Sequence, residues 1–560
     1  MVAALSLITL WLVAVPIGML LFSSIKSTEN RLPFEEGDFT INNYLSVFTS
    51  SVTYQLLLTS IVYAIGSLML GMVIALIISW LLERSDVPFR RTLSQFVVIP
   101  MTVPPILIVM AWILLASPSI GLFNVIIRQI FDLNIDRGPF NVYSMGGMIL
   151  VTGLSLVPSV FLMLSGVFRN MDPSLEEAAE VSGYSKLQTL RFITLPLAKP
   201  AILAAAIYFF IVSLETFEIP ALLGLTANIH VFSTEVYQAT HPPSGLPDYG
   251  LASSYAIVFL GIAFALVLTY YYLTRRSEQF VVVTGKGYRP KVIELGILKY
   301  AAAAFIVFYF LFAIIFPLVI LLWASLLSFY SPPSLDALSR ISWDNYNILS
   351  NPLLTKVLLN TLMVSIGAAT LTMLLSSLIA WVSTRTKGMG RTLLDFMSFI
   401  TIGIPSVVIG LALIFVYLSV PLPLYGTIWI LIIGFTTRFL SFGVRIMGAA
   451  MLQIHRELEE AAYINGAGWF RTFFRIMMPL LSPSLVNGWI WVVIHSLREV
   501  PIALMLLSTS NVVLSTLIWN AWEEEARIGP AAVYGVLLII FSVFLTVIGR
   551  LIEKRGKRAI

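Results

Sequence analysis

The sequence predicts an all-α polytopic membrane protein in which twelve transmembrane helices form two parallel six-helix repeats. Three observations predict this fold class: a low content of charged residues, a series of long apolar segments and an internal duplication. Of the 560 residues, 58% are hydrophobic and 11% are charged, whereas soluble domains carry about 25% charged residues. So few polar side chains cannot cover a surface in water, which excludes a soluble globular fold.

Twelve apolar segments are each long enough to cross a membrane as a helix. A helix rises 1.5 Å per residue, so about 20 apolar residues span the hydrocarbon core, and a helix satisfies its own backbone hydrogen bonds there. Pro100, Pro104, Pro105 and Pro405 fall inside such segments and predict kinked helices. The segments lie near residues 2–23, 54–82, 93–116, 143–168, 200–224, 250–274, 298–328, 356–383, 393–420, 427–449, 484–508 and 531–552.

The basic residues divide the loops into two classes. Most of the 34 Lys and Arg residues lie in alternate loops, near residues 84–91, 169–199, 275–299, 385–391, 445–475 and 550–558. Because cytoplasmic loops are enriched in Lys and Arg, we expect these loops and both termini to be cytoplasmic. Arg438 and Arg498 remain inside predicted spans. The net charge of +5 therefore reflects topology, and no nucleic-acid partner is needed to explain it.

The two halves of the chain repeat one another. Gly66, Trp80 and Arg84 recur 301 residues later as Gly367, Trp381 and Arg385. A second block recurs after 283 residues, so the second half lacks about 17 residues between its third and fourth spans. We therefore expect a first six-span half at 1–280, a cytoplasmic linker at 281–297 and a second half at 298–560, with a pathway between the halves.

Each half carries the same motif in the cytoplasmic loop after its fourth span, near residues 172–196 and 456–479. Both loops read E-A-A-x₃-G-x₉-I-x-[LM]-P. Acidic residues favour the first turn of a helix, and a glycine in the left-handed conformation commonly ends one. We expect a short helix, a turn and a second helical segment that Pro196 or Pro479 ends. The motif residues are Glu177, Ala178, Ala179 and Gly183 in the first loop and Glu460, Ala461, Ala462 and Gly466 in the second.

These duplicated loops resemble the EAA loops of ABC importer permeases. The resemblance implies the type I importer fold, in which the short helix is a coupling helix that sits in a groove of an ATP-hydrolysing subunit. It also implies two copies of that ATPase, an extracytoplasmic substrate-binding protein and a bacterial cytoplasmic (inner) membrane location. Two fused halves in one chain resemble ferric-iron permeases, although thiamine, phosphonate and polyamine permeases share the same loops.

No enzymatic or cofactor site is expected in the chain itself. Gly285-Lys286-Gly287 lacks the upstream glycine and the following Ser or Thr of a phosphate-binding loop, so ATP and Mg²⁺ belong to the partner ATPase. The absence of Cys excludes thiolate metal sites and thiol nucleophiles. The four His residues have no ligand spacing, and we expect no resident metal.

Four charged residues within the predicted spans are candidates for the transport pathway, because ionisable side chains in a membrane are costly and commonly functional. Glu215 and Glu218 lie in the fifth span, and Arg498 and Glu499 in the eleventh. One hypothesis is a gate in which Glu215 or Glu218 approaches Arg498. The alternative is that each charge pairs within its own half. A third hypothesis makes the glutamates transient ligands for ferric ion, since hard carboxylates suit hard cations.

A secondary transporter of the major-facilitator type is the competing class, because it also has twelve spans in two parallel halves. The loop at Glu83–Arg91 lacks the Gly-x₃-Asp-Arg-x-Gly-Arg pattern common in that class. The duplicated EAA loops also have no role there. The sequence therefore favours an importer permease.

Overall fold

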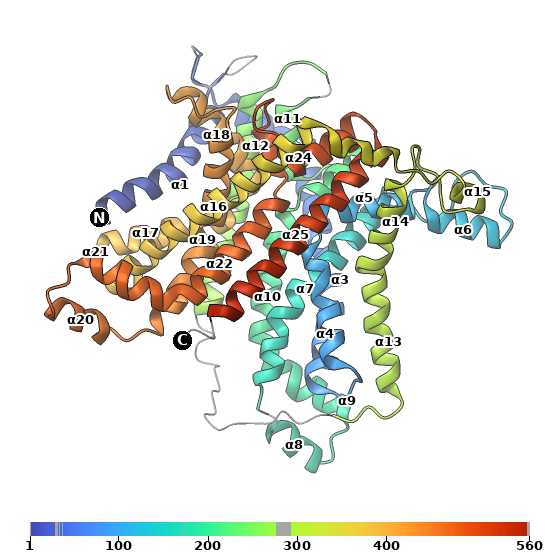
Figure 1. Cartoon of the computed structure of the whole chain (residues 1–560), viewed down its shortest axis with the longest axis horizontal. Helices are drawn as coiled ribbons and strands as arrows, with labels where there is room; N and C mark the ends of the chain where they lie inside the picture. The colour runs from blue at the N-terminus through green and yellow to red at the C-terminus, as the bar shows by residue number, and fades with distance from the viewer. Residues whose placement is uncertain are drawn as a thin grey trace. The chain divides into compact units, whose positions relative to one another are not determined.

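The computed structural model describes residues 2–27, 32, 34–35, 37–172, 174–242, 244–275 and 293–556 (Figure 1). Most of the predicted linker, at 281–292, lies outside the described residues, as does the Gly285-Lys286-Gly287 segment. In the described ranges the regular structure is helical apart from two isolated β-bridges.

The helices confirm the prediction of an all-α polytopic membrane protein. Ten described helices are long and apolar enough to cross a membrane, and two bent pairs of helices bring the number to twelve. The bent pairs join residues 90–102 to Pro105–Ala116 at 98° and residues 389–403 to Ser406–Ser419 at 116°. Pro104 and Pro405 stand at these breaks. The residue before each proline is extended, because the proline ring disfavours the helical conformation there.

The described helices form two compact units, each assembled from separate parts of the sequence. Unit 1 comprises Met1–Ser50, Glu235–Phe264 and Tyr346–Ile560, and unit 2 comprises Ser51–Thr234 and Ala265–Asn345. Two of the four boundaries fall within α11 (Phe232–Thr240) and α12 (Tyr249–Arg275), and the others lie just before Ser51 and Tyr346.

Unit 2 is built around α3 and α7, which pack along each other, with α10 against both. α13 packs on α4 and α14 on α5 (Figure 1). Its helices are α3 (Ser51–Arg84), α4 (Arg90–Val98), α5 (Pro105–Ala116), α6 (Leu122–Ile130), α7 (Met145–Asn170), α8 (Ser174–Val181), α9 (Lys186–Thr189), α10 (Leu195–Glu215), α13 (Leu298–Phe310), α14 (Phe316–Ser325) and α15 (Leu335–Leu338).

Unit 1 repeats this arrangement with α16 and α19 as the central pair and α22 against both. α1 packs on α17 and α18. Its helices are α1 (Val2–Ser24), α2 (Asn42–Thr49), α16 (Pro352–Arg385), α17 (Met389–Ile400), α18 (Ser406–Ser419), α19 (Ile428–Leu452), α20 (Glu457–Ile464), α21 (Trp469–Thr472), α22 (Met478–Arg498), α23 (Pro501–Met505), α24 (Leu514–Trp519) and α25 (Ile528–Gly556).

The compact units do not coincide with the sequence halves. The first span of the first half, α1, belongs to unit 1 with the helices of the second half, and α13 and α14 belong to unit 2 with helices of the first half. The boundary predicted at 281–297 therefore separates the two repeats but not the two compact units. Hydropathy identifies a span without identifying the helices on which it packs.

A matched glycine allows the central pair of each unit to pack closely. A Cβ atom on Gly66 would lie 2.5 Å from Cδ1 of Ile149, and one on Gly367 would lie 2.9 Å from Cδ1 of Ile432. Real Cβ atoms do not approach other atoms so closely, so a side chain at either glycine would require the isoleucine opposite it to move. The glycines that revealed the duplication therefore have a packing role in both copies.

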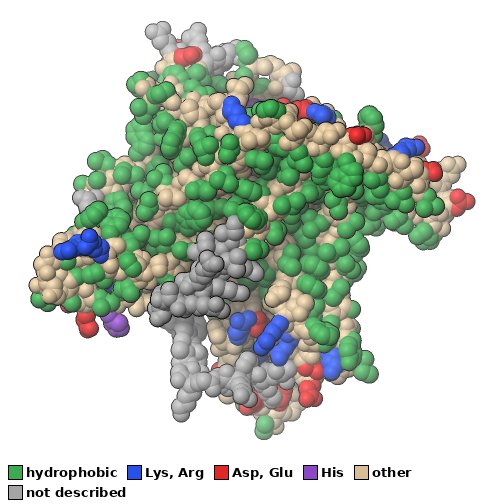
Figure 2. All heavy atoms as spheres, viewed as in Figure 1, with side chains coloured by type: hydrophobic (Ala, Val, Ile, Leu, Met, Phe, Trp, Pro, Cys, Tyr) green, Lys and Arg blue, Asp and Glu red, His purple; other side chains and the backbone are tan. Residues whose placement is uncertain are grey.

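Charged side chains are separated from the apolar flanks of the long helices. Figure 2 shows hydrophobic side chains over the long helices, while Lys, Arg, Asp and Glu gather near helix ends, around α8 and α9 and around α20. This distribution suits helices whose middle parts lie in hydrocarbon and whose ends lie in water.

Candidate coupling loops and intramembrane charges

The first helix of each EAA loop has acidic residues in its first turn and a glycine after its end, as predicted. α8 begins at Ser174, whose backbone N–H donates a 2.9 Å hydrogen bond to the Asp172 carboxylate, and α20 begins at Glu457. Gly183 and Gly466 follow these helices with φ values of +87° and +78°. This left-handed conformation is the one in which glycine ends a helix.

Each short helix turns one face inward and another outward. Glu176 and Glu459 are only 3% and 5% exposed, and Ala179 and Ala462 are buried beside them. The other motif residues, Glu177, Ala178, Glu460 and Ala461, are exposed. The two copies therefore divide the motif in the same way, and the paired alanines have different surroundings: one packs inward while the other faces out.

A buried ion pair holds each short helix to the end of a long one. Arg84, the last residue of α3, pairs with Glu176. Arg385, the last residue of α16, pairs with Glu459 at 2.6 Å between Nε and Oε1. We call Arg84 and Arg385 the anchoring arginines. Both are nearly inaccessible to solvent, and a buried charge of this kind requires a charged partner.

The anchoring arginines also reach the end of a second long helix. Arg84 Nη1 donates to the Met171 carbonyl at 3.3 Å, just after α7. Arg385 Nη2 donates to the carbonyls of Met451 and Ile454 at 3.1 and 2.7 Å, at the end of α19. Each guanidinium thus ties the ends of two membrane-spanning helices to the short helix.

Sequence reasoning missed this contact. In the sequence, Arg84 and Arg385 identified the repeat and the loops rich in Lys and Arg, and no role was predicted for Glu176 and Glu459, the glutamates just before each motif. The signal was present, because both the arginine and the preceding glutamate recur at the offsets of their blocks. Their partnership appears only when the fold brings the two blocks together.

The second carboxylate oxygen is satisfied differently in the two copies. Thr194 Oγ1 donates to Glu176 at 2.6 Å, whereas Trp381 Nε1 donates to Glu459 at 3.2 Å. Trp80, the repeat equivalent of Trp381, has no hydrogen-bond partner among the described side-chain contacts. The ion pair is therefore duplicated, while its supporting hydrogen bond comes from a different element in each unit.

The prediction that Pro196 and Pro479 end the second helical segment is wrong. The helix continues through both prolines into α10 and α22, and a π-helical turn precedes each one, at Leu190–Thr194 and Phe473–Met477. A proline lacks the N–H of the normal helical bond and its ring crowds the preceding turn. The wider π turn accommodates both defects without breaking the helix.

The first EAA loop has an additional support in unit 2. Ser85 and Ile293 form a parallel β-bridge directly after α3. Asp86 accepts a 2.8 Å hydrogen bond from the Leu295 backbone N–H and lies 3.7 Å from Lys299 Nζ, and Lys186 donates to the Glu294 carbonyl. The segment 293–299 therefore braces the first loop, and the described residues show no such bridge after α16.

The intramembrane charges lie where the fifth and eleventh spans are broken. Glu215 is the last residue of α10 and Arg498 the last of α22, and the next residues, Thr216 and Glu499, are extended. Ser233 Oγ donates to the Thr216 carbonyl at 2.8 Å, and Ser515 Oγ donates to the Glu499 carbonyl at 2.9 Å. These matched serines satisfy carbonyls that the broken helices leave free.

Glu499 has neighbours within its own unit. Its carboxylate lies near Ser406, at the start of α18, and interacts electrostatically with Arg438 of α19. Arg438 itself donates to the Ile404 carbonyl at 3.2 Å, beside the break of the ninth span. Sequence reasoning noted Arg438 as an intramembrane charge but gave it no partner. These contacts favour pairing within one unit for Glu499.

The gate hypothesis stays a prediction. Glu215 and Glu218 belong to unit 2, and Arg498 and Glu499 belong to unit 1. In the described parts of the chain, no group of three or more His, Asp or Glu side chains is arranged to hold a metal ion.

The fold and these loops define a class of protein, namely a polytopic membrane protein with two equivalent loops, each of which carries a short helix tied to the ends of two spans. The chain belongs to the family of inner membrane components of binding-protein-dependent transport systems, whose model matches residues 68–279 and 372–558. The two matched segments correspond to the two repeats.

Two curated relatives cover most of the chain. It is 28% identical to the ferric transport system permease protein FbpB of Actinobacillus pleuropneumoniae, over 71% of this chain and 57% of that protein. It is 27% identical to the putative ferric transport system permease protein FbpB 1 of Haemophilus influenzae, over 74% of this chain and 64% of that protein. The chain thus spans less than two thirds of the length of either relative.

A solved structure is similar to one part of the chain. It is a bacterial alginate ABC transporter in complex with an alginate pentasaccharide-bound periplasmic protein, with a TM-score of 0.37 and 18% identity. The similarity covers 46% of this chain and 94% of that chain.

Proposed function

We propose that this permease is the membrane subunit of an ATP-driven importer. It receives substrate from an extracytoplasmic binding protein and passes it to the cytoplasm by alternating access. Two copies of a separate ATPase dock on the two EAA loops and supply the energy. Both termini and both EAA loops then face the cytoplasm, as the distribution of Lys and Arg predicts.

The observation that carries this proposal is the pair of matched, exposed and anchored short helices. Val181 of α8 and Ile464 of α20 are 91% and 86% exposed at equivalent positions, next to the exposed Glu and Ala of each motif. Exposed apolar side chains on a helix that is tied down from behind indicate a docking surface. Because the anchoring arginines link each helix to two spans, a force applied at that surface reaches the membrane.

Ferric iron is the substrate that we propose, because the two relatives that cover most of this chain are named ferric transport permeases. Thiamine, phosphonate and polyamines remain alternatives within the same machinery. Purified ATPase, permease and candidate binding proteins distinguish them, since the correct loaded binding protein is expected to stimulate ATP hydrolysis several-fold. Stimulation by another loaded binding protein, with none by the ferric one, would reject iron.

Docking of the ATPase can be tested at the two exposed apolar positions. Val181→Asp and Ile464→Asp should each weaken copurification of the ATPase, because a charge replaces an apolar contact. Phe329→Asp is the matched control, since Phe329 is 90% exposed but lies in the loop after α14. Equal ATPase recovery from all three variants would show that α8 and α20 are not the docking helices.

A further inference from the structure

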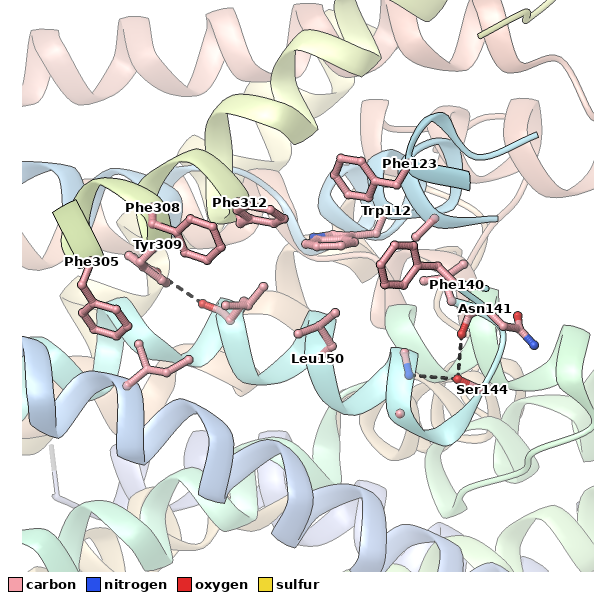
Figure 3. A pocket seen from close by; sticks show the side chains of 16 residues that line it. Trp112, Phe123, Phe140, Asn141, Ser144, Leu150, Phe305, Phe308, Tyr309 and Phe312 are labelled. Atoms are coloured by element: carbon pink, nitrogen blue, oxygen red, sulfur yellow. Dashed lines mark hydrogen bonds between the residues drawn. The ribbon is translucent and has the colours of Figure 1, made fainter. Parts of the chain in front are cut away.

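A cavity of about 520 Å³ lies within unit 2 (Figure 3). Aromatic side chains from α5, α13 and the turn after α13 form a row along it, including Phe305, Phe308, Phe312 and Trp112. Leu150 of α7 faces this row from the other side. No carboxylate and no basic side chain lines the cavity. Its body therefore suits a hydrocarbon chain.

Part of the cavity wall comes from a segment that is longer than its counterpart in the other copy of the repeat. Twenty-eight residues separate α5 from α7, whereas eight separate α18 from α19. The longer connection contains α6 and supplies Phe123 and Phe140 to the cavity wall. The extra residues of the first repeat, inferred from the sequence, thus form part of the cavity wall in unit 2.

One buried polar group in the cavity wall has no partner. Trp112 is 3% exposed, and its indole N–H makes no hydrogen bond in the described structure. Its ring stacks beside Phe312 and meets Phe123 edge-on. A buried donor left unpaired is costly, and indole N–H groups normally find an acceptor. A ligand oxygen beside Trp112 would satisfy it.

The far end of the cavity is the N-terminus of α7, marked by Ser144 in Figure 3. The Ser144 side chain accepts from the Gly147 N–H at 3.1 Å. At Gly146 an added Cβ would meet nothing closer than Ser144 Oγ at 3.8 Å, so this end is open. The N-terminus of a 26-residue helix carries partial positive charge and attracts phosphate groups.

We propose that this cavity binds one glycerophospholipid from the leaflet opposite the EAA loops. One acyl chain lies among the aromatic side chains, an ester carbonyl accepts from Trp112, and the phosphate lies at the N-terminus of α7. The leaflet follows from α7 itself, because its other end leads directly to Asp172 and the first EAA loop. The cavity lies between α13 and the helices α5, α6 and α7. A lipid bound there contacts these helices and stabilises their packing in unit 2.

The first test removes the unpaired donor. Delipidated full-length chain in detergent is titrated with palmitoyl-oleoyl-phosphatidylglycerol, and bound lipids are counted by native mass spectrometry. The wild type is expected to bind one lipid at least tenfold more tightly than any further one. Trp112→Phe should weaken that lipid about five- to tenfold. Trp323→Phe is the matched control, because Trp323 donates to the Ser331 carbonyl elsewhere in unit 2.

The second test measures whether the N-terminus of α7 binds the phosphate, with two variants of Gly146 that have the same shape but differ in charge. Gly146→Asp places a negative charge at the start of α7, which stabilises the helix but repels a phosphate, and should weaken the lipid at least tenfold. Gly146→Asn has the same shape without the charge and should change binding less than twofold. A purely structural role for Gly146 would affect both variants alike.

Three results would overturn the proposal. The first is a wild type with no distinguishable tight lipid. The second is that Trp112→Phe and Gly146→Asp bind the lipid as tightly as their controls, Trp323→Phe and Gly146→Asn, while the thermal stability of all four variants is unchanged. The third is equally tight binding of a diacylglycerol with the same chains, since that lipid has no phosphate for α7 to attract.

Discussion

At the scale of single residues, the anchoring arginines connect the EAA loops to the membrane. Arg84 and Arg385 occupy equivalent positions, have side chains that are 0% and 8% exposed, and pair with equivalent glutamates. Each arginine also donates a hydrogen bond to a carbonyl at the end of α7 or α19. It therefore connects three segments: its own long helix, a second long helix and the short helix of the EAA loop.

Removing one member of the first ion pair should be more damaging than removing both. Arg84→Met leaves Glu176 buried without its charged partner, which is expected to cost about 3–5 kcal/mol. The double variant Arg84→Met/Glu176→Met removes the buried charge and should recover most of the lost thermal stability. Thermal unfolding of the purified permease measures both effects.

The same variants separate stability from coupling. The double variant should remain deficient in ATP hydrolysis stimulated by the binding protein, because the attachment between α8 and α3 is gone. Wild-type stimulation in a stable double variant would mean that the ion pair has only a structural role.

At the scale of elements, the segment 293–299 makes the two EAA loops unequal. It braces the first loop through the Ser85 bridge and through Asp86. The repeat equivalent of Asp86 is Lys387, which reverses the charge at this position. The brace of the first EAA loop therefore comes from the segment that joins the two halves of the sequence.

Asp86→Ala should lower the coupling of ATP hydrolysis to transport, because the brace loses the Leu295 hydrogen bond and the contact with Lys299. Lys387→Ala at the equivalent site is expected to leave coupling unchanged. The ratio of substrate transported to ATP hydrolysed, measured in proteoliposomes, checks this. A loss of equal size in both variants would contradict a special role for the brace.

The packing of long helices also depends on local close approach. Gly71→Leu in α3 should sharply reduce the yield of folded permease, because a Cβ there would lie 2.8 Å from the Gly153 carbonyl oxygen, and overpacking costs about 1–3 kcal/mol or more. Gly166→Leu in α7 meets nothing within 4 Å and should be tolerated. Size-exclusion profiles of both variants provide the comparison.

At the scale of the whole molecule, the sequence could predict spans, breaks and repeat, because each depends on local composition. Pro104 and Pro405 stand at the bends, where the residue before each proline is extended, whereas Pro158 and Pro200 lie inside continuous helices. The placement of α1 and α13 in their compact units could not be predicted, because apolar composition identifies a span without identifying the helices on which it packs. The pair of Arg84 and Glu176 could not be predicted either. The two residues belong to sequence blocks that repeat at different offsets, and only the fold brings these blocks together.

The intramembrane charges give a prediction at the same scale. Arg498→Met should alter ATP hydrolysis coupled to transport while the permease still assembles with its ATPase, if Arg498 takes part in opening and closing the pathway. Arg527→Met is the control, because Arg527 is a 58% exposed arginine that pairs with Glu525 just before α25. Unaltered coupling in Arg498→Met would remove the gate hypothesis.

The central claim is that this chain transports only when ATPases act on its two EAA loops. Uptake of radioactive ferric iron into proteoliposomes, with loaded binding protein outside and ATP inside, tests it most directly. We predict uptake that requires the ATPase and falls to background in the Val181→Asp/Ile464→Asp variant. Uptake that continues without the ATPase and follows an imposed ion gradient would contradict the account.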